Sequence, residues 1–311
     1  MRLTAETLKG NWATLLLPVN TDDSINYTLL AEEIDQLIAA QVDGIYSNGS
    51  AGEFHNQTEA EFDKINELLA SKCRMAGMPF QIGASHPSPI ISKQRLQRSV
   101  ALLPDAIQVI LPDWIVANQQ EQVSFLQGMS HAAAGIPLVL YNPPHAKMVL
   151  PPQAYAGFKD LVPSLIGIKV LSGDVQWVND MKRYGKHLSV FVPGHMLATG
   201  FANGIASGAY SNVACINAKA AQQWWDDMQT DINSALDLEF RIQQFFKECI
   251  VPYQQQRFSN PALDKFLSAV GGYINVGTRL RWPYHFISED EVLTIRKRAQ
   301  ALIPEFFTTK H

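Results

Sequence analysis

Leu165–Ile166–Gly167–Ile168–Lys169 is an apolar run of strand length that ends in a single lysine. The chain continues as Val170–Leu171–Ser172–Gly173–Asp174, in which small residues lead to an aspartate that can cap a helix. A lysine at the buried end of a strand loses hydration, which lowers its pKa, and a neutral amine can form a Schiff base with a carbonyl group. Taken alone, the segment favours a solvated lysine that follows a strand. The rest of the chain decides between the two interpretations.

Strand-like and helix-like segments alternate along the first 230 residues. The predicted strands cover residues 12–17, 44–47, 80–83, 106–110, 137–141, 165–169, 188–192 and 208–211. Repeated βα units with short links require a parallel sheet, and eight such units close into a barrel. An open doubly wound sheet is the alternative, but Pro18–Val19–Asn20 follows the first strand where that fold carries glycines. The pattern therefore predicts a (β/α)8 TIM barrel over residues 1–230, with a C-terminal helical region, residues 231–311, packed on the barrel.

Composition narrows the class of protein. The 311 residues are 47% hydrophobic and 17% charged, which is typical of a globular protein with a large core. A net charge of −4 gives no indication of nucleic acid or an anionic membrane as a partner. No signal peptide or transmembrane helix is indicated. Cys73, Cys215 and Cys249 are far apart and odd in number, so we expect reduced thiols in a cytoplasmic protein rather than disulfides or a zinc site.

The predicted strand ends collect small, hydroxylic and nucleophilic residues, and the site of such a barrel lies at this end. Three segments resemble motifs of the dihydrodipicolinate synthase/N-acetylneuraminate lyase superfamily. Gly49–Glu53 (Gly-Ser-Ala-Gly-Glu) looks like its Gly-Ser/Thr-x-Gly-Glu motif, Leu140–Pro143 is similar to its Leu-Tyr-Asn-x-Pro motif, and Gly167–Lys169 to its Gly-x-Lys signature. The order of the motifs and the 28-residue step from Tyr141 to Lys169 also fit. The resemblance covers about residues 10–225.

The resemblance implies a class I lyase without a metal or organic cofactor, in which Lys169 forms a covalent imine with a small 2-oxo acid. Tyr141 would relay protons to and from the imine. Ser50, together with the backbone N–H groups of Ser50 and Ala51, would bind the substrate carboxylate, since glycines let a backbone turn its N–H groups toward an anion. Gly194 and Tyr210 would line the pocket. The resemblance also implies a homo-oligomer, a tetramer or a dimer.

Departures from the family pattern concern the second substrate. Ala51 stands where many members carry a second threonine that extends the proton relay, and Ala146 stands where the synthases carry an arginine. Asp113–Trp114 replaces the paired tyrosines of the synthases, one of which crosses a subunit interface. These losses argue against a true dihydrodipicolinate synthase. We expect Trp114 and His145 to contact substrate.

Several reactions stay open. The imine could serve aldol cleavage that releases pyruvate, or dehydration of a 2-keto-3-deoxy sugar acid. The apolar Ala51 and the tryptophan are also reminiscent of hydratase-aldolases that act on arylidene pyruvates, and a non-catalytic relative that only binds a 2-oxo acid is a further alternative. His86, His145 and His195 fall at predicted strand ends, but no close pair such as His-x-His supports a metal site. Glu53 is interpreted as structural.

Overall fold

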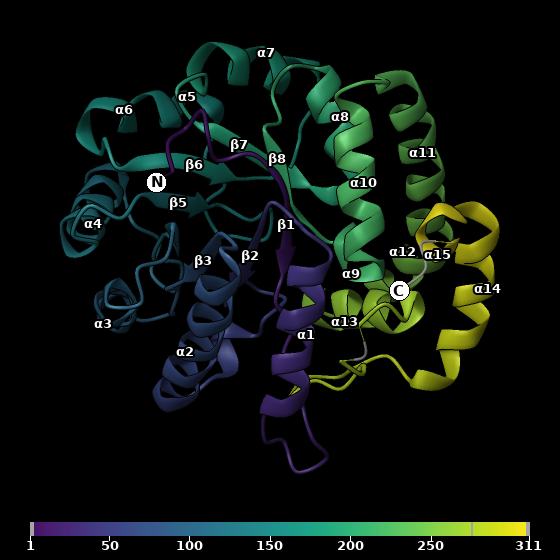
Figure 1. The fold of residues 1–311 in the computed structure, drawn as a ribbon. Helices are drawn as coiled ribbons and strands as arrows, with labels where there is room; N and C mark the ends of the chain where they lie inside the picture. Colours follow the sequence, from purple (N-terminus) through teal and green to yellow (C-terminus); the bar gives the residue numbers. More distant parts are fainter. Residues whose placement is uncertain (1–2, 275, 309–311) are drawn as a thin grey trace.

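The computed structural model describes residues 3–274 and 276–308, and its strands form a closed parallel barrel. Neighbouring strands follow chain order, and β8 (Gly208–Ser211) pairs with β1 (Gly10–Thr14) to close the sheet. Figure 1 shows the strands at the centre with helices around them. The predicted (β/α)8 TIM barrel is therefore confirmed. Residues 1, 2, 275 and 309–311 of the two predicted regions lie outside the described part of the chain.

The other strands lie close to their predicted positions. They are β2 (Gly44–Ser47), β3 (Phe80–Gly83), β4 (Ala106–Ile110), β5 (Leu138–Tyr141), β6 (Leu165–Lys169) and β7 (Ser189–Pro193). The first strand is the exception, because it ends at Thr14 and not at Leu17. Leu15, Leu16 and Leu17 stay buried after the backbone has left the sheet, so hydrophobicity alone extended the prediction too far.

Helices connect the successive strands. They are α1 (Tyr27–Ala39), α2 (Glu59–Ala76), α3 (Pro89–Val100), α4 (Gln119–Ala132), α5 (Pro152–Ala156), α6 (Phe158–Leu161), α7 (Val175–Tyr184) and α8 (Leu197–Ala202), while α9 (Val213–Ile216) and α10 (Ala218–Met228) follow β8. Their starts are encoded locally. The Thr58 side chain and the Glu61 carboxylate accept each other's backbone N–H as a capping box, and Asp174 caps α7 by accepting the N–H of Trp177 at 2.9 Å.

The chain after residue 230 is also helical. Its elements are α11 (Ile232–Phe245), α12 (Val251–Gln255), α13 (Asn260–Gly271), α14 (Val292–Leu302) and α15 (Glu305–Thr308). The pattern predicts one helix over 232–250, but a π-helical turn at Phe246–Ile250 interrupts it. Figure 1 shows α11–α15 gathered beside α10 on one side of the barrel. Because α13 packs on α9, which directly follows β8, it lies at the carboxyl end of the strands. The domain boundary near residue 230 stays a prediction.

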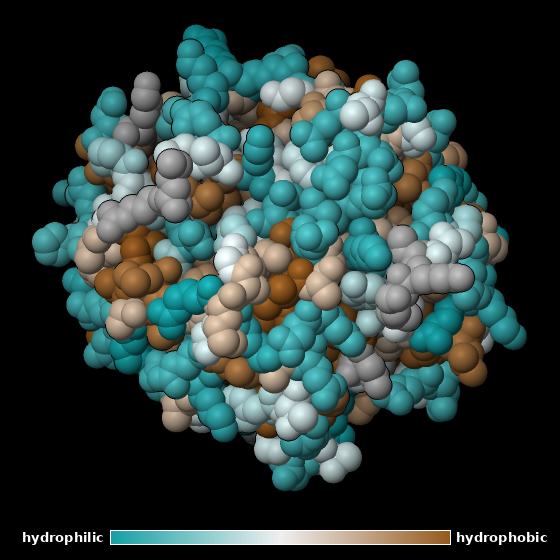
Figure 2. Space-filling model, in the orientation of Figure 1, coloured by the Kyte–Doolittle hydropathy of each residue, from teal (hydrophilic) through white to brown (hydrophobic). Residues whose placement is uncertain are grey.

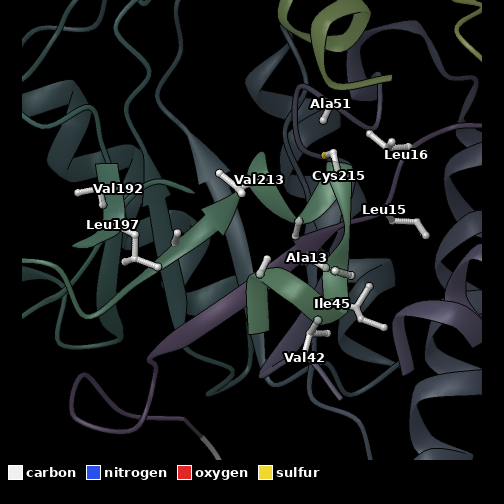
Figure 3. Close-up of a cluster of buried hydrophobic side chains, with 14 of the residues drawn as sticks. Ala13, Leu15, Leu16, Val42, Ile45, Ala51, Val192, Leu197, Val213 and Cys215 are labelled. Carbon is white, nitrogen blue, oxygen red and sulfur yellow. The ribbon is translucent and has the colours of Figure 1, made fainter. Parts of the chain in front are cut away.

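Apolar side chains form two buried layers. One lies between the strands and the helices, and Figure 3 shows a part of it in which Ala13, Ile45 and Val192 come from strands. The other fills the barrel interior and consists of Leu8, Trp12, Tyr46, Ala106, Val139, Phe191 and Tyr210. The barrel interior is thus a packed core and not a pore.

Hydrophilic side chains predominate on the face seen in Figure 2, with hydrophobic ones in small groups between them. Cys73, Cys215 and Cys249 are buried free thiols. In the described part of the chain, none of the helices has the length and apolar character that a membrane span requires.

Candidate active site

Tyr141 and Lys169 are neighbours in the barrel sheet. They are partners in the parallel register of β5 and β6, and each is the last residue of its strand. The Nζ atom of Lys169 lies 4.4 Å from the centre of the Tyr141 ring. The 28 residues between them in sequence therefore bring two polar side chains together at the carboxyl end of the barrel.

Aromatic rings surround the Lys169 amine. Its Nζ donates a hydrogen bond to the Tyr46 hydroxyl at 3.2 Å and lies 5.3 Å from the centre of the Tyr210 ring. Burial lowers the pKa of Lys169 to about 8, although Asp264 and Cys215 act in the opposite direction. Sequence reasoning misses Tyr46, because an aromatic residue inside a short strand looks like any other core residue.

The loop after β2 presents open backbone donors. The N–H groups of Gly52 and Glu53 bond to the carbonyls of Gly49 and Ser50, whereas those of Ser50 and Ala51 meet no acceptor among residues 3–274 and 276–308. A Cβ atom on Gly49 would lie 2.6 Å from the Tyr46 ring, so this position requires glycine. Successive open N–H groups in a turn form an anion-binding site.

Most of the predicted site residues line one cavity of about 330 Å³, the lysine cavity. These are Ser50, Ala51, Tyr141, Lys169 and Tyr210. Gly194 lies beside it, between the lining residues Pro193 and His195. A Cβ on Gly194 would approach the Ser211 hydroxyl to 2.6 Å, so a larger residue would displace the end of β8.

Tyr210 belongs mainly to the packed interior. Its hydroxyl donates to the Gln81 side chain at 2.7 Å, and its ring centre lies 4.5 Å from that of Phe191 and 4.6 Å from that of Tyr46. Burial raises the pKa of the Tyr210 hydroxyl. Tyr210 therefore contributes its ring to the wall of the lysine cavity, while its hydroxyl is hydrogen-bonded to Gln81 inside the barrel.

The C-terminal helices close the other side of the lysine cavity. Phe246 and Ile250 come from the π-helical turn, and Asp264 comes from α13. Burial raises the pKa of Asp264 to about 7, while Lys169 lowers it. Sequence reasoning misses Asp264. The one feature of the sequence that points to Asp264 is its place beside Lys265 in a helix that carries no other charged residue.

Comparison with known proteins identifies the family. The model of the dihydrodipicolinate synthetase family matches residues 7–302. This chain belongs to the dihydrodipicolinate synthetase family. It is 25% identical to the N-acetylneuraminate lyase of Rattus norvegicus over 260 residues, 80% of each chain, and 24% identical to the 4-hydroxy-tetrahydrodipicolinate synthase of Ehrlichia canis, over 95% of this chain and 97% of that one. A solved structure of a Ruminococcus gnavus sialic acid aldolase, a catalytic lysine mutant, shares the fold with a TM-score of 0.83 at 17% identity, covering 99% of both chains.

Ala51 is the first departure from the pattern of the dihydrodipicolinate synthetase family. Only 4% of its surface is exposed, and Figure 3 labels it in the same part of the apolar cluster as Leu16 and Cys215. A methyl group here packs with apolar neighbours, so the proton relay that a threonine would extend has no hydroxyl at this point.

Two residues expected to contact substrate lie in a neighbouring cavity, the outer cavity, of about 390 Å³. His145 and Trp114 line it, together with Ala146 and with Tyr141, which also lines the lysine cavity. Trp114 is 79% exposed and lies under Lys147, whose Nζ is 5.0 Å from its ring centre. Trp114 and His145 therefore line the outer cavity and not the lysine cavity, and Tyr141 lines both.

The three histidines at strand ends do not converge. His195 lines the lysine cavity, where its ring stacks on Phe246 and its Nδ1 is 2.9 Å from the Asn212 amide, whereas His86 and His145 line the outer cavity. Burial lowers the pKa of all three imidazoles. Within the described ranges, no group of three or more His, Cys, Asp and Glu side chains could hold a metal ion.

Proposed function

We propose that the protein is a class I lyase that forms a Schiff base between Lys169 and a 2-oxo acid. The amine itself carries the proposal, because it ends a barrel strand beside Tyr141 with a pKa lowered to about 8. At pH 7 about a tenth of such an amine is neutral, against about one part in 3,000 for an ordinary lysine with a pKa of 10.5. A neutral amine is the form that attacks a carbonyl group.

The reaction follows from the residues around the amine. The Lys169 Nζ attacks C2 of the 2-oxo acid, and the resulting carbinolamine loses water to give a protonated imine. The substrate carboxylate accepts hydrogen bonds from the open N–H groups of Ser50 and Ala51. The Tyr141 hydroxyl moves protons near C2, and an interaction with the Ser50 hydroxyl lowers its otherwise raised pKa. No metal or organic cofactor enters this proposal.

The protonated imine draws electrons from the substrate. Either the C3–C4 bond breaks, which leaves an enamine that becomes pyruvate after protonation and hydrolysis, or a C4 hydroxyl leaves after loss of a C3 proton. Gln254 and Asn260 line the cavity, and their side chains make no hydrogen bond within the described part of the chain. Free amide groups suit a hydroxylated substrate, so we favour a 2-keto-3-deoxy sugar acid.

An arylidene pyruvate is the second candidate substrate. Phe246, Ile250 and Leu263 give the lysine cavity an apolar side that would accept an aromatic ring. The names of the relatives support lyase chemistry in general, since they include a lyase and an aldolase with a catalytic lysine, but they do not choose between these substrates.

Trapping the imine tests the proposal. The protein is incubated with pyruvate, reduced with borohydride and weighed by mass spectrometry. We expect a stable adduct that is lost in Lys169→Ala and retained in Lys219→Ala, in which an exposed lysine of α10 is removed. No adduct with pyruvate or any other 2-oxo acid would sink the proposal.

Turnover separates an enzyme from a non-catalytic binding relative. We expect released pyruvate or a dehydration product from a panel of 2-keto-3-deoxy sugar acids and arylidene pyruvates. A protein that traps pyruvate but turns over no member of the panel would be a 2-oxo-acid binder instead.

A further inference from the structure

Asp264 is the single acidic side chain among the described residues that line the lysine cavity. It projects from α13, which packs on α9 at the carboxyl end of the strands. Within residues 3–274 and 276–308, its carboxylate accepts no hydrogen bond from a protein donor. The Asp264 side chain is half-buried at the cavity wall, and it has no protein partner to give up when a cation or hydroxyl arrives with the substrate or the reaction.

The groups that face Asp264 come from four elements. They are Lys169 on β6, Tyr141 on β5, Tyr46 on β2 and Cys215 on α9, each of which interacts electrostatically with it. Among the described residues, Lys169 is the one lysine or arginine that lines the cavity, so Asp264 and Lys169 are its two oppositely charged groups.

Imine formation changes the charge requirement of this cavity. The neutral amine becomes an iminium cation at a position where burial opposes charge, so a nearby anion stabilises it. The substrate carboxylate is engaged by the N–H groups of Ser50 and Ala51 in the proposed mode. Asp264 is then the protein carboxylate available to balance the iminium.

We propose that Asp264 is a second acid–base catalyst of the imine, which protonates the departing carbinolamine hydroxyl and then remains beside the iminium as its counterion. In this step the C2–O bond breaks, the oxygen leaves as water with the proton of Asp264, and the nitrogen lone pair of Lys169 forms the C=N bond. Hydrolysis of the product imine by water returns the proton to Asp264. The inference rests on the proposed Schiff-base function.

The other groups near C2 are poorly suited as the source of this proton, and Tyr141 can only relay it. Ala51 has no hydroxyl, and burial raises the pKa of Tyr141 to about 12, which makes it a weak acid at neutral pH. The pKa of Asp264, at about 7, leaves roughly half of its carboxyl groups protonated there. His195 also lines the cavity, but its lowered pKa keeps it neutral and its Nδ1 faces Asn212.

The pairing predicts the shape of the pH profile. Adduct formation needs one proton shared between Lys169 and Asp264, whose pKa values are about 8 and about 7. The rate should therefore rise to about pH 7, stay level to about pH 8, and fall about tenfold per pH unit above that as the second proton is lost.

Timed borohydride quenching with subsaturating pyruvate from pH 5.5 to 10 tests the inference. We expect Asp264→Asn to form adduct about 100-fold more slowly at pH 7 and to lose the fall above pH 8. Its profile should instead rise once, as the Lys169 amine loses its proton, and then level off at alkaline pH. Asp264→Glu should keep the alkaline fall, and Asp237→Asn, an exposed change on α11, should match the unmodified protein.

The outcomes distinguish the two proposals. A wild-type rate that stays level above pH 8 overturns the role of Asp264, whether or not the variants fold. An Asp264→Asn profile equal to the wild-type profile overturns it as well. Failure of the wild-type protein to form any adduct instead overturns the Schiff-base function itself.

Discussion

Replacing Lys265 by Met tests how the C-terminal helices are fastened to the barrel. The Lys265 Nζ lies 2.6 Å from a carboxylate oxygen of Glu53, with 0% and 1% of the two side chains exposed. It also donates to the Arg279 carbonyl at 2.6 Å, and the second Glu53 oxygen accepts the Arg281 N–H at 3.3 Å. Glu53 closes the loop that carries Ser50, and Lys265 follows Asp264, so one ion pair joins both sides of the lysine cavity.

The expected loss is large because the variant leaves a buried carboxylate without its cation. Breaking one side of a buried pair costs about 3–5 kcal/mol. An unfolding entropy of about 2.1 cal/mol/K per residue gives roughly 0.65 kcal/mol/K for 311 residues, so the melting temperature should fall by about 5–8 °C. The double variant Glu53→Gln/Lys265→Met should recover at least half of this loss, since the buried charge is then gone.

Calorimetric and denaturant unfolding measure the effect, and Lys72→Met is the matched control. Lys72 forms an ion pair of 2.7 Å with Asp35, but the side chains are 20% and 60% exposed, so its loss should cost less than about 1 kcal/mol. Two results would contradict this role of the ion pair. One is a loss of unfolding free energy in Lys265→Met no larger than that in Lys72→Met. The other is a double variant whose loss equals the sum of the losses of Glu53→Gln and Lys265→Met.

Three further outcomes follow from the site and the surface. Tyr141→Phe should slow turnover by about 100-fold to 10,000-fold yet still yield trapped adduct at long times, and an unaffected rate would exclude it as the proton relay. Tyr46→Phe removes a hydrogen-bond acceptor of the charged Lys169 amine, so the pKa of that amine should fall and adduct formation should begin at lower pH; an alkaline shift would contradict this. Trp114 and Ile115 are 79% and 78% exposed, and we propose that they contact a second copy of the chain. Sedimentation should show a dimer or tetramer that Trp114→Glu/Ile115→Lys dissociates, whereas a wild-type monomer would disprove the contact.

The parts of the site that could be predicted are those set by local sequence. Strand ends follow from apolar runs and the small residues after them, so the sequence predicts that Lys169 and Tyr141 lie at the carboxyl end of the barrel. The position of Ser50 in a loop can also be predicted, since Gly49 and Gly52 on its two sides indicate a turn.

The parts that could not be predicted depend on tertiary packing. Tyr46 contacts Lys169 because two strands far apart in the chain face each other across the barrel, and no local pattern distinguishes it from other interior aromatics. The exposed position of Trp114 beside Lys147 depends on how the loop after β4 folds, and its predicted contact with substrate stays a prediction. Asp264 reaches the cavity only because α13 packs on α9.

This division has a chemical consequence. The barrel supplies the amine, the tyrosine and the loop proposed to bind the substrate carboxylate, which are the groups that the proposed reaction needs for any 2-oxo acid. The C-terminal helices supply Asn260 and the π-helical turn Phe246–Ile250, which face the part of the substrate beyond C3 in the proposed mode, and Asp264, which acts at C2. Because the Lys265–Glu53 pair holds α13 against the loop, a change in the C-terminal helices could alter the choice of substrate without moving Lys169. Substrate specificity should therefore respond to substitutions at Asn260 and in the π-helical turn, while imine formation should respond to substitutions at the strand ends and at Asp264.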